Sequence, residues 1–257
     1  ACILDRCSIC AGTLQEAVRE TAAAKAGFTE EDVYARAAGV VEKAISHGTT
    51  RMRTFVEVDP RAGLRSFEAI RRIRSDYAFA IDIQICAFAQ DGLTQEPETL
   101  DLLDRALSEG ADLVGGCPYT DPDPVRHVGL IFDLAEKHGV DADFHLDFDL
   151  DPASSNLPVV IAETVSRGYQ GRVTVGHMTR LSAMRPDRIE QVITDLREAG
   201  IALVTLPATD LFLMGRDHDH HIPRGVAPVH RFAQNGVTAA IATNNGLNPF
   251  TPYGDAS

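Results

Sequence analysis

The sequence predicts a (β/α)8 TIM barrel that lacks its first strand, and three observations indicate this fold class. Helical and strand patterns alternate along the whole chain. The strand segments are short, apolar and β-branched, as buried parallel strands are. No Gly-x-Gly-x-x-Gly loop follows a predicted strand, which favours a barrel over a nucleotide-binding doubly wound sheet.

Each element is predicted from its own residue pattern. Two amphipathic helices are expected first, at residues 14–25 and 30–47, followed by a strand at 52–58 that ends in Asp59-Pro60. Further strands are expected at 80–87, 112–115, 142–148, 172–176, 202–206 and 238–242. Further helices are expected at 64–75, 98–108, 124–138, 157–166, 186–199 and 227–234. Five glycines fall just past a helix, where a left-handed residue favours Gly: Gly110, Gly139, Gly168, Gly200 and Gly236.

The sequence contains about seven strands, one fewer than a complete barrel has. It opens at Ala1 without an initiator Met or a secretory signal. We therefore expect a strand just before Ala1, a last helix after Ser257, and one incomplete catalytic barrel over residues 1–257. The length suits a single α/β domain, and no linker divides it.

The composition excludes two classes of partner. Lys and Arg number 24 against 37 Asp and Glu, which gives a formal charge of −13 with neutral histidines. An acidic chain without Trp is poorly suited to hold the phosphate backbone of nucleic acid. No apolar run approaches the roughly 18 residues that span a bilayer. We expect neither nucleic acid nor a membrane as a partner.

Five cysteines suit a reducing compartment. Cys2, Cys7 and Cys10 lie close together, while Cys86 and Cys117 sit in apolar runs. An odd count in this arrangement favours free thiols in the cytoplasm over a disulfide framework. Cys7-x-x-Cys10 also matches half of a zinc site or a redox pair, and we favour plain reduced thiols.

Polar residues end most predicted strands, which is where barrels of this class carry their chemistry. His145 and His177 end neighbouring strands, so their imidazoles could converge on one metal ion at about 2.0–2.1 Å. The alternative is a pair of neutral histidines hydrogen-bonded in the barrel mouth. Because side chains alternate along a strand, we expect His145, Asp147 and Asp149 on one side. The histidine-rich run at 217–221 is interpreted as a solvated loop.

Six stretches of the sequence occur together in one order. They are GTTRMRT (48–54), ICAFAQDG (85–92), GADLVGG (110–116), FHLD (144–147), RVTVGH (172–177) and GR (215–216). Together they resemble the cytosine deaminase-like branch of the amidohydrolase superfamily. That family is a metal-dependent barrel, usually with a β-sandwich built from both chain ends, that hydrolyses C–N bonds in cytosine and related rings.

The resemblance implies a set of metal ligands. In the family a His-x-His on strand one, a His on strand five, a His on strand six and an Asp on strand eight hold the metal. His145 and His177 match the strand-five and strand-six ligands, so the cofactor is expected to be a divalent ion, zinc or iron. The His-x-His pair and the sandwich segments are expected outside this chain.

The sequence departs from the family at the residues that handle protons. Asn244 stands at the strand-eight aspartate, Phe148 at the ring-side glutamate and Phe55 at a strand-two histidine. An amide oxygen is a weaker ligand than a carboxylate and cannot act as a base. Candidates for proton transfer are then Asp147, Asp149 and Glu57; we favour Asp147, whose alternative role is to orient an imidazole.

The expected site therefore has three parts. The catalytic residues are Asp147 and Asn244, and the metal ligands are His145 and His177. The substrate-binding residues are Gln90, Asn245 and Phe250, of which Gln90 matches a glutamine that reads the pyrimidine edge and Asn245 follows the strand-eight position.

The function expected from this resemblance is hydrolysis of a C–N bond, by deamination or by amide or ring hydrolysis, in a small nitrogenous substrate. Cytosine itself is disfavoured because Phe148 removes the ring-side acid and Phe55 makes the pocket more apolar. One alternative is an inactive barrel that binds a small molecule; another is a metal enzyme of a different reaction class. Anionic substrates would be repelled unless a metal, Arg53 or Arg216 compensates. The sequence leaves open whether the protein forms a homo-oligomer.

Overall fold

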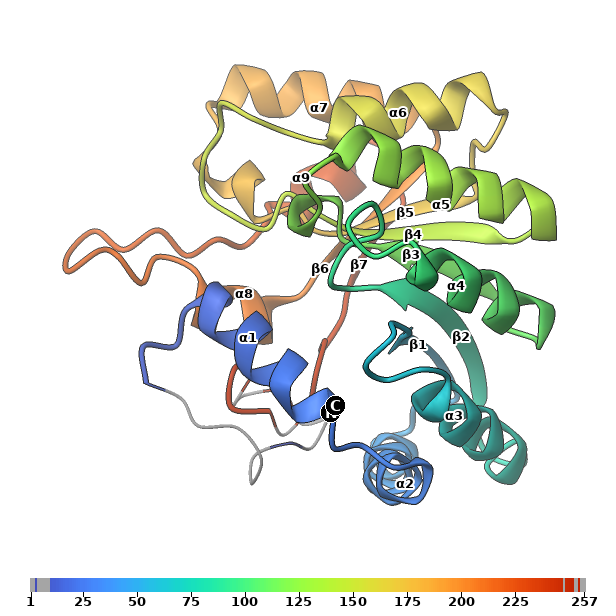
Figure 1. Cartoon of the computed structure of the whole chain (residues 1–257). Helices are drawn as coiled ribbons and strands as arrows, with labels where there is room; N and C mark the ends of the chain where they lie inside the picture. Colours follow the sequence, from blue (N-terminus) through green and yellow to red (C-terminus); the bar gives the residue numbers. More distant parts are fainter. Residues whose placement is uncertain (1–2, 4–9, 247, 252–253, 255–257) are drawn as a thin grey trace.

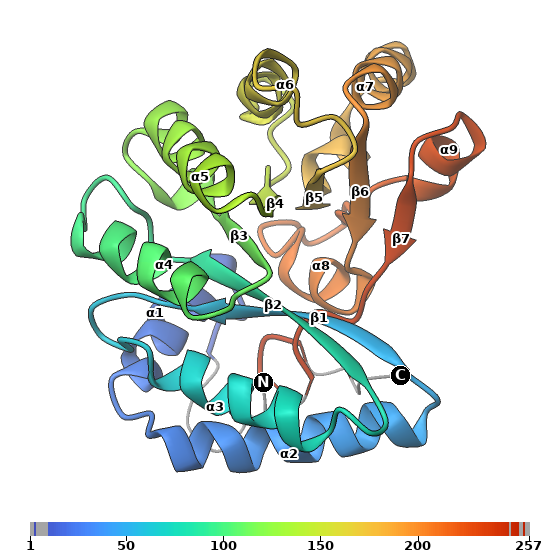
Figure 2. The ribbon, with the colours of Figure 1, turned by 90° about the vertical axis from the view of Figure 1, so that its right-hand side faces the viewer.

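A single curled sheet of seven parallel strands organises the computed structural model, which describes residues 3, 10–246, 248–251 and 254. The strands lie in sequence order, and Figure 2 shows helices fanned around the outer side of the curl. They are β1 (Arg51–Glu57), β2 (Asp82–Ala89), β3 (Leu113–Gly116), β4 (Asp141–Leu146), β5 (Val173–His177), β6 (Ile201–Thr205) and β7 (Ala239–Ile241).

The alternation predicted from the sequence is confirmed, and the fold is an α/β fold with a partial-barrel sheet. Strands β1 and β7 form its two edges, and within the described part of the chain no pairing joins them. The nine α-helices of the described residues are α1 (Leu14–Lys25), α2 (Glu30–Ser46), α3 (Arg65–Asp76), α4 (Glu98–Ser108), α5 (Pro124–His138), α6 (Leu157–Ser166), α7 (Pro186–Glu198), α8 (Pro207–Leu213) and α9 (Val229–Gln234). Figure 1 shows α5, α6 and α7 along one side of the sheet.

All seven strands lie within two residues of their expected bounds, and the two largest differences, in β2 and β4, have local reasons. Strand β2 begins two residues late because the N–H groups of Ala80 and Ile81 donate to the carbonyl of Tyr77, which closes a turn after α3. Strand β4 stops at Leu146 because the next residue, Asp147, takes a left-handed conformation with φ 48°. A strand cannot continue through that conformation, and the predicted strand at 142–148 is wrong over its last two residues.

Helix α8 was missed by the sequence patterns. It has seven residues, too few for a 3.6-residue period to emerge, and it begins with Pro207 at its first position. Short 3-10 segments also follow β3 and β5, at Pro118–Thr120 and Thr179–Ala183. Because α8 follows β6 directly, it lies at the carboxyl edge of the sheet, where it supplies residues to the site.

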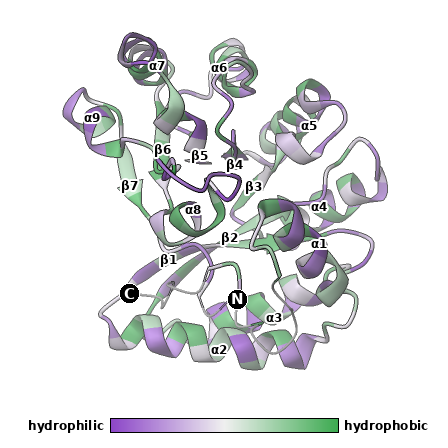
Figure 3. Ribbon diagram, turned by 90° about the vertical axis from the view of Figure 1, so that its left-hand side faces the viewer, coloured by the Kyte–Doolittle hydropathy of each residue, from purple (hydrophilic) through white to green (hydrophobic). Residues whose placement is uncertain are grey.

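The core lies between the sheet and its outer helices. The rings of Phe132 on α5 and Phe144 on β4 pack with centroids 5.7 Å apart, and both are fully buried. Figure 3 shows the helices with mixed hydrophobic and hydrophilic faces, as amphipathic helices on a sheet require. The predicted glycine caps are confirmed: Gly139 ends α5 at φ 67°, and the other four also have positive φ.

Helix α1 is fixed at both ends. The Thr13 hydroxyl accepts from the N–H of Glu16, while the Glu16 carboxylate accepts from the N–H groups of Cys10, Ala11 and Gly12. This reciprocal cap sets where the helix begins. At the other end Lys25 is buried against carboxylates that follow β1 and β2.

The described residues bear on three expectations from the sequence: the absence of a membrane span, the state of the cysteines and the nature of the 217–221 run. No helix among them is long and apolar enough to cross a membrane. Cys10, Cys86 and Cys117 are free thiols, as expected, whereas Cys2 and Cys7 lie outside the described residues. The run at 217–221 is exposed throughout, which confirms its interpretation as a solvated loop.

Candidate active site

A cavity of about 600 Å³ opens at the carboxyl edge of the sheet. Among its lining residues are six of the seven predicted site residues: Gln90, His145, His177, Asn244, Asn245 and Phe250. Aromatic side chains supply much of the remaining wall near the histidines: Phe55, Phe88, Tyr119 and Phe148. The cavity therefore combines an apolar surface with a few polar groups, which is typical of small-molecule sites.

His145 lies near the end of β4 and is packed between two aromatic rings. Its centroid is 4.8 Å from that of Phe55 and 4.5 Å from that of Phe88. The residue is 8% exposed, and its Nε2 atom has no hydrogen-bond partner among the described residues. Burial, with a smaller contribution from His177, holds the pKa of His145 well below its usual value. A neutral imidazole with an unpaired buried nitrogen is suited to bind a metal.

His177 is the last residue of β5, and a carboxylate orients its ring. Nδ1 lies 2.8 Å from Oδ1 of Asp210, a fully buried residue of α8. The second Asp210 oxygen accepts from the N–H of Leu206 at 3.0 Å. Because a carboxylate only accepts, Nδ1 is the nitrogen that donates here, so in the neutral imidazole the lone pair lies on Nε2. In the sequence Asp210 is one of several polar residues that follow predicted strands, and its spacing from His177 gives no signal of this contact.

The two imidazoles lie side by side. Strands β4 and β5 pair with His145 opposite Gly176 and Leu146 opposite His177. The ring centroids are 4.8 Å apart at an interplanar angle of 87°. Phe148 stacks on His177 with centroids 4.0 Å apart. The residues present thus fit part of a metal site, although the described residues contain no group of three His, Cys, Asp or Glu that could hold an ion.

The expectation that Asp147 shares the face of His145 is wrong. After β4 ends at Leu146, the left-handed backbone of Asp147 turns its carboxylate into the following loop. There it accepts hydrogen bonds from the Ser155 hydroxyl and from the N–H of Asn156 at 2.9 Å. Asp147 is fully buried and does not line the cavity, and its contacts hold the loop that follows β4.

Two further expectations change for the same reason. Asp149 is paired with Arg180, whose Nε donates to Oδ1 at 2.9 Å, and it does not line the cavity. Phe148, which strand alternation would place on the face opposite His145, lines the cavity, as its match to a ring-side residue implies. It shares an apolar cluster with Ala17, Leu213 and Phe250.

Asn244 lies after β7 in a left-handed conformation with φ 63°. Its Nδ2 donates to the Thr209 hydroxyl at 2.7 Å. That hydroxyl also lies 2.9 Å from the hydroxyl of Thr251. The amide nitrogen is therefore committed to α8, and the amide oxygen is the group that Asn244 can present to a ligand.

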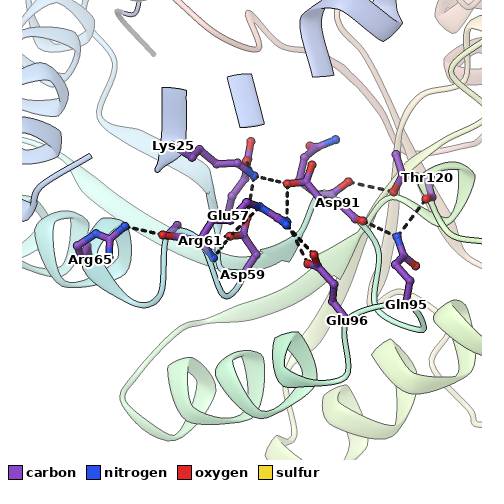
Figure 4. Close-up of polar contacts among 11 residues, drawn as sticks. Lys25, Glu57, Asp59, Arg61, Arg65, Asp91, Gln95, Glu96 and Thr120 are labelled. Atoms are coloured by element: carbon purple, nitrogen blue, oxygen red, sulfur yellow. Dashed lines mark hydrogen bonds and ion pairs between the residues drawn. The ribbon is translucent and has the colours of Figure 1, made fainter. Parts of the chain in front are cut away.

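A buried ion cluster borders the cavity and was not predicted. Lys25 Nζ lies 2.7 Å from Glu57, 2.8 Å from Asp59 and 2.6 Å from Asp91. Figure 4 shows Arg61 within the same cluster, where it contacts Asp91 at 3.0 Å and Glu96 at 2.6 Å. In the sequence only the places of Glu57 near the end of one predicted strand and of Asp91 after the next indicate such a cluster, since Lys25 belongs to a helix far from them in the chain.

The comparisons with known proteins agree with this fold and cavity. The chain belongs to the amidohydrolase family, whose model matches residues 9–257. It is 30% identical to a pterin deaminase of Rhizobium rhizogenes over 90% of this chain and 53% of that protein. It is 28% identical to an N-isopropylammelide isopropyl amidohydrolase of a Pseudomonas species, over 84% of this chain and 52% of that protein.

A solved structure shows the same relationship. The crystal structure of 5-methylcytosine deaminase from Klebsiella pneumoniae, liganded with 5-fluorocytosine, matches with a TM-score of 0.90 at 30% identity. The match covers 96% of this chain and 60% of that one. The chain thus spans little more than half the length of the relatives it matches.

Proposed function

We propose that the protein is a metal-dependent amidohydrolase that hydrolyses a C–N bond of a small nitrogen-rich ring or amide. The observation that carries this proposal is the pair of neighbouring histidines in one cavity, one with an unpaired buried Nε2 and one oriented by a carboxylate. The relatives named above are deaminases and an amidohydrolase, which supports the same bond class.

The proposed cofactor is a divalent metal ion, zinc or iron, held in part by His145 and His177. Such an ion supplies an activated water, since it lowers the pKa of bound water to about 7. Imidazole nitrogens suit either metal. The Asn244 amide oxygen would be a weaker further ligand than a carboxylate. We also propose that the sheet belongs to a (β/α)8 barrel and that the protein acts in the cytoplasm.

The chain's own residues would bind and orient the substrate. Phe55, Phe88 and Phe148 offer aromatic faces beside the histidines, and such faces favour a flat ring. Gln90 and Asn245 line the same cavity and can each donate and accept hydrogen bonds. The large apolar wall also excludes water, which strengthens every polar contact made there.

The alternative of an inactive, ligand-binding barrel rests on Asn244 and Phe148, which cannot exchange protons. The relatives named above are described as enzymes, so the comparisons give this alternative no support. A metal enzyme of another reaction class would release neither ammonia nor an amine.

Release of ammonia or an amine tests the proposal directly. Purified protein, supplied with zinc or iron, is incubated with pterin, 5-methylcytosine and N-isopropylammelide, and the products are identified by mass spectrometry. We expect release from at least one of these or a related amino heterocycle, and none from the His145→Ala variant. Turnover that persists in that variant, or products of decarboxylation or isomerisation, would contradict the proposal.

A further inference from the structure

Two carboxylates line the cavity within the described part of the chain, Glu57 and Asp91. Asp91 is the more constrained of the two, because both Lys25 and Arg61 contact it and its side chain is 14% exposed. Glu57 contacts Lys25 alone among these cations, and its side chain is 28% exposed. Glu57 is therefore the carboxylate more available to a ligand.

Glu57 lines the same cavity as the paired histidines and shares a sheet face with the rings that pack on His145. It lies two residues after Phe55 on β1, so the two side chains point to the same face of the strand. In the sheet register it is opposite Phe88 of β2. Phe55 and Phe88 are the rings that pack on His145. A ligand against the unpaired Nε2 of His145 would thus have the Glu57 carboxylate at its edge.

The charges around the cavity favour a hydrogen-bond donor at this place. In the ion cluster two cations, Lys25 and Arg61, face four carboxylates, Glu57, Asp59, Asp91 and Glu96. Two negative charges remain uncompensated there. The cavity wall on the side of Glu57 therefore carries net negative charge.

Each arginine that lines the cavity already contacts a carboxyl group. Arg36 pairs with Asp32 at 2.9 Å, Arg51 with Asp82 at 3.2 Å and Arg53 with Asp143 at 2.7 Å. Arg216 does not line the cavity; its guanidinium lies over the Phe212 ring at 4.2 Å. Neither arginine considered from the sequence as a counter-charge is free to hold an anionic substrate.

We propose that Glu57 is a specificity-determining residue that accepts hydrogen bonds from amino or ring N–H groups of the substrate. Lys25 acts as the positioning residue that holds the Glu57 carboxylate against the cavity wall. The site thus selects neutral or cationic amino-substituted heterocycles and rejects anionic rings. This inference rests on the proposed function, since it assigns the substrate class of the same cavity.

Equilibrium binding of two rings of one size tests the inference without any turnover. Melamine presents amino groups around a triazine ring, whereas cyanuric acid presents carbonyl oxygens and is an anion at mildly alkaline pH. Isothermal titration of the full chain with each ring is compared for wild type, Glu57→Gln and Glu96→Gln. Glu96→Gln is the matched control, because it removes the same charge from the same cluster at a residue that does not line the cavity.

We expect wild type to bind melamine more tightly than cyanurate. Glu57→Gln should weaken melamine binding about ten- to hundredfold, the range for a hydrogen bond to a charged group, and leave cyanurate binding equal or tighter. Glu96→Gln should change neither by more than about twofold. Glu57→Gln should fold normally because Lys25 keeps its contacts with Asp59 and Asp91, and thermal unfolding checks this.

The proposed role of Glu57 would be wrong if wild type fails to bind melamine or binds cyanurate more tightly. It would also be wrong if Glu57→Gln leaves melamine binding unchanged, or weakens the binding of both rings equally. These binding results are separate from the result that would refute the proposed function. Binding that follows the expected pattern, with no release of ammonia or an amine and no ring-opened product from any ring, would refute hydrolysis and leave the role of Glu57 in binding intact.

Discussion

Asp210 on α8 lies 2.8 Å from Nδ1 of His177 at the end of β5, and this contact determines which nitrogen of the imidazole faces the cavity. The carboxylate is itself fixed by the N–H of Leu206. A helix too short to be predicted thus sets the tautomer of a proposed metal ligand. Substitution of Asp210 therefore tests whether His177 is a metal ligand.

Asp210→Asn should weaken metal binding about ten- to hundredfold, the range found when the partner of a ligand histidine is removed. An amide oxygen accepts a weaker hydrogen bond from Nδ1, and a flipped amide would stabilise the wrong tautomer. Competition with a fluorescent zinc chelator measures the affinity. Asp219→Asn, which changes an exposed aspartate of the 217–221 loop, is the control and should have no effect. Equal affinities for the two variants would show that Asp210 has no influence on the metal.

Asn244→Asp should strengthen both metal binding and hydrolysis. A carboxylate is a better ligand than an amide oxygen and can accept a proton, and a positioned base contributes about 10²–10⁴-fold to a rate. The exchange is compatible with the surroundings, because the Thr209 hydroxyl that now accepts from Nδ2 can donate to a carboxylate instead. Steady-state release of ammonia or amine should rise at least about tenfold. An unchanged or lower rate in a folded, metal-loaded variant would contradict the assignment of Asn244.

The buried carboxyl group of Asp143 on β4 should give stability a specific pH dependence. Burial raises the pKa of Asp143 to about 7, against the opposing effect of the Arg53 guanidinium 2.7 Å away. A carboxyl whose pKa is raised on folding favours the folded state while it is protonated. Its contribution is present in full below the unfolded pKa near 3.8 and is lost as the pH rises toward about 7.

Urea unfolding of wild type and Asp143→Asn across this window checks the sign. Relative to the variant, wild type should lose stability as the pH rises from about 5 to 7, by at most about 1.4 kcal/mol per pH unit for one proton. The amide cannot ionise, so differences from other groups cancel in the comparison. A difference between the two proteins that stays constant over the window, or that favours wild type at higher pH, would contradict the assignment.

The sequence predicted the sheet well because each buried strand is a local apolar run. Alternation of these runs with helices identified the strands and placed His145 and His177 at the ends of neighbours. The resemblance to cytosine deaminase-like proteins then indicated Gln90, Asn244 and Asn245. All of these residues line one cavity, as parallel strands that end at one edge of a sheet require.

The errors arose where the local pattern stopped applying. The two-residue alternation that placed Asp147 beside His145 holds only while the chain stays extended, and the left-handed backbone at Asp147 ends it. Contacts between residues that are far apart in the chain leave no local pattern in the sequence. Asp210 reaches back 33 residues to His177, and Lys25 reaches forward 66 residues to Asp91. Such pairs depend on tertiary packing, which periodicity does not encode.

Metal content per chain tests the central claim most directly. Protein purified without chelators and a His145→Ala, His177→Ala double variant are compared by elemental analysis, with circular dichroism to confirm that both are folded. We predict about one zinc or iron ion per wild-type chain and background metal in the double variant. Equal metal content in the two proteins would show that these histidines do not hold a metal, and the proposed hydrolytic site would be wrong.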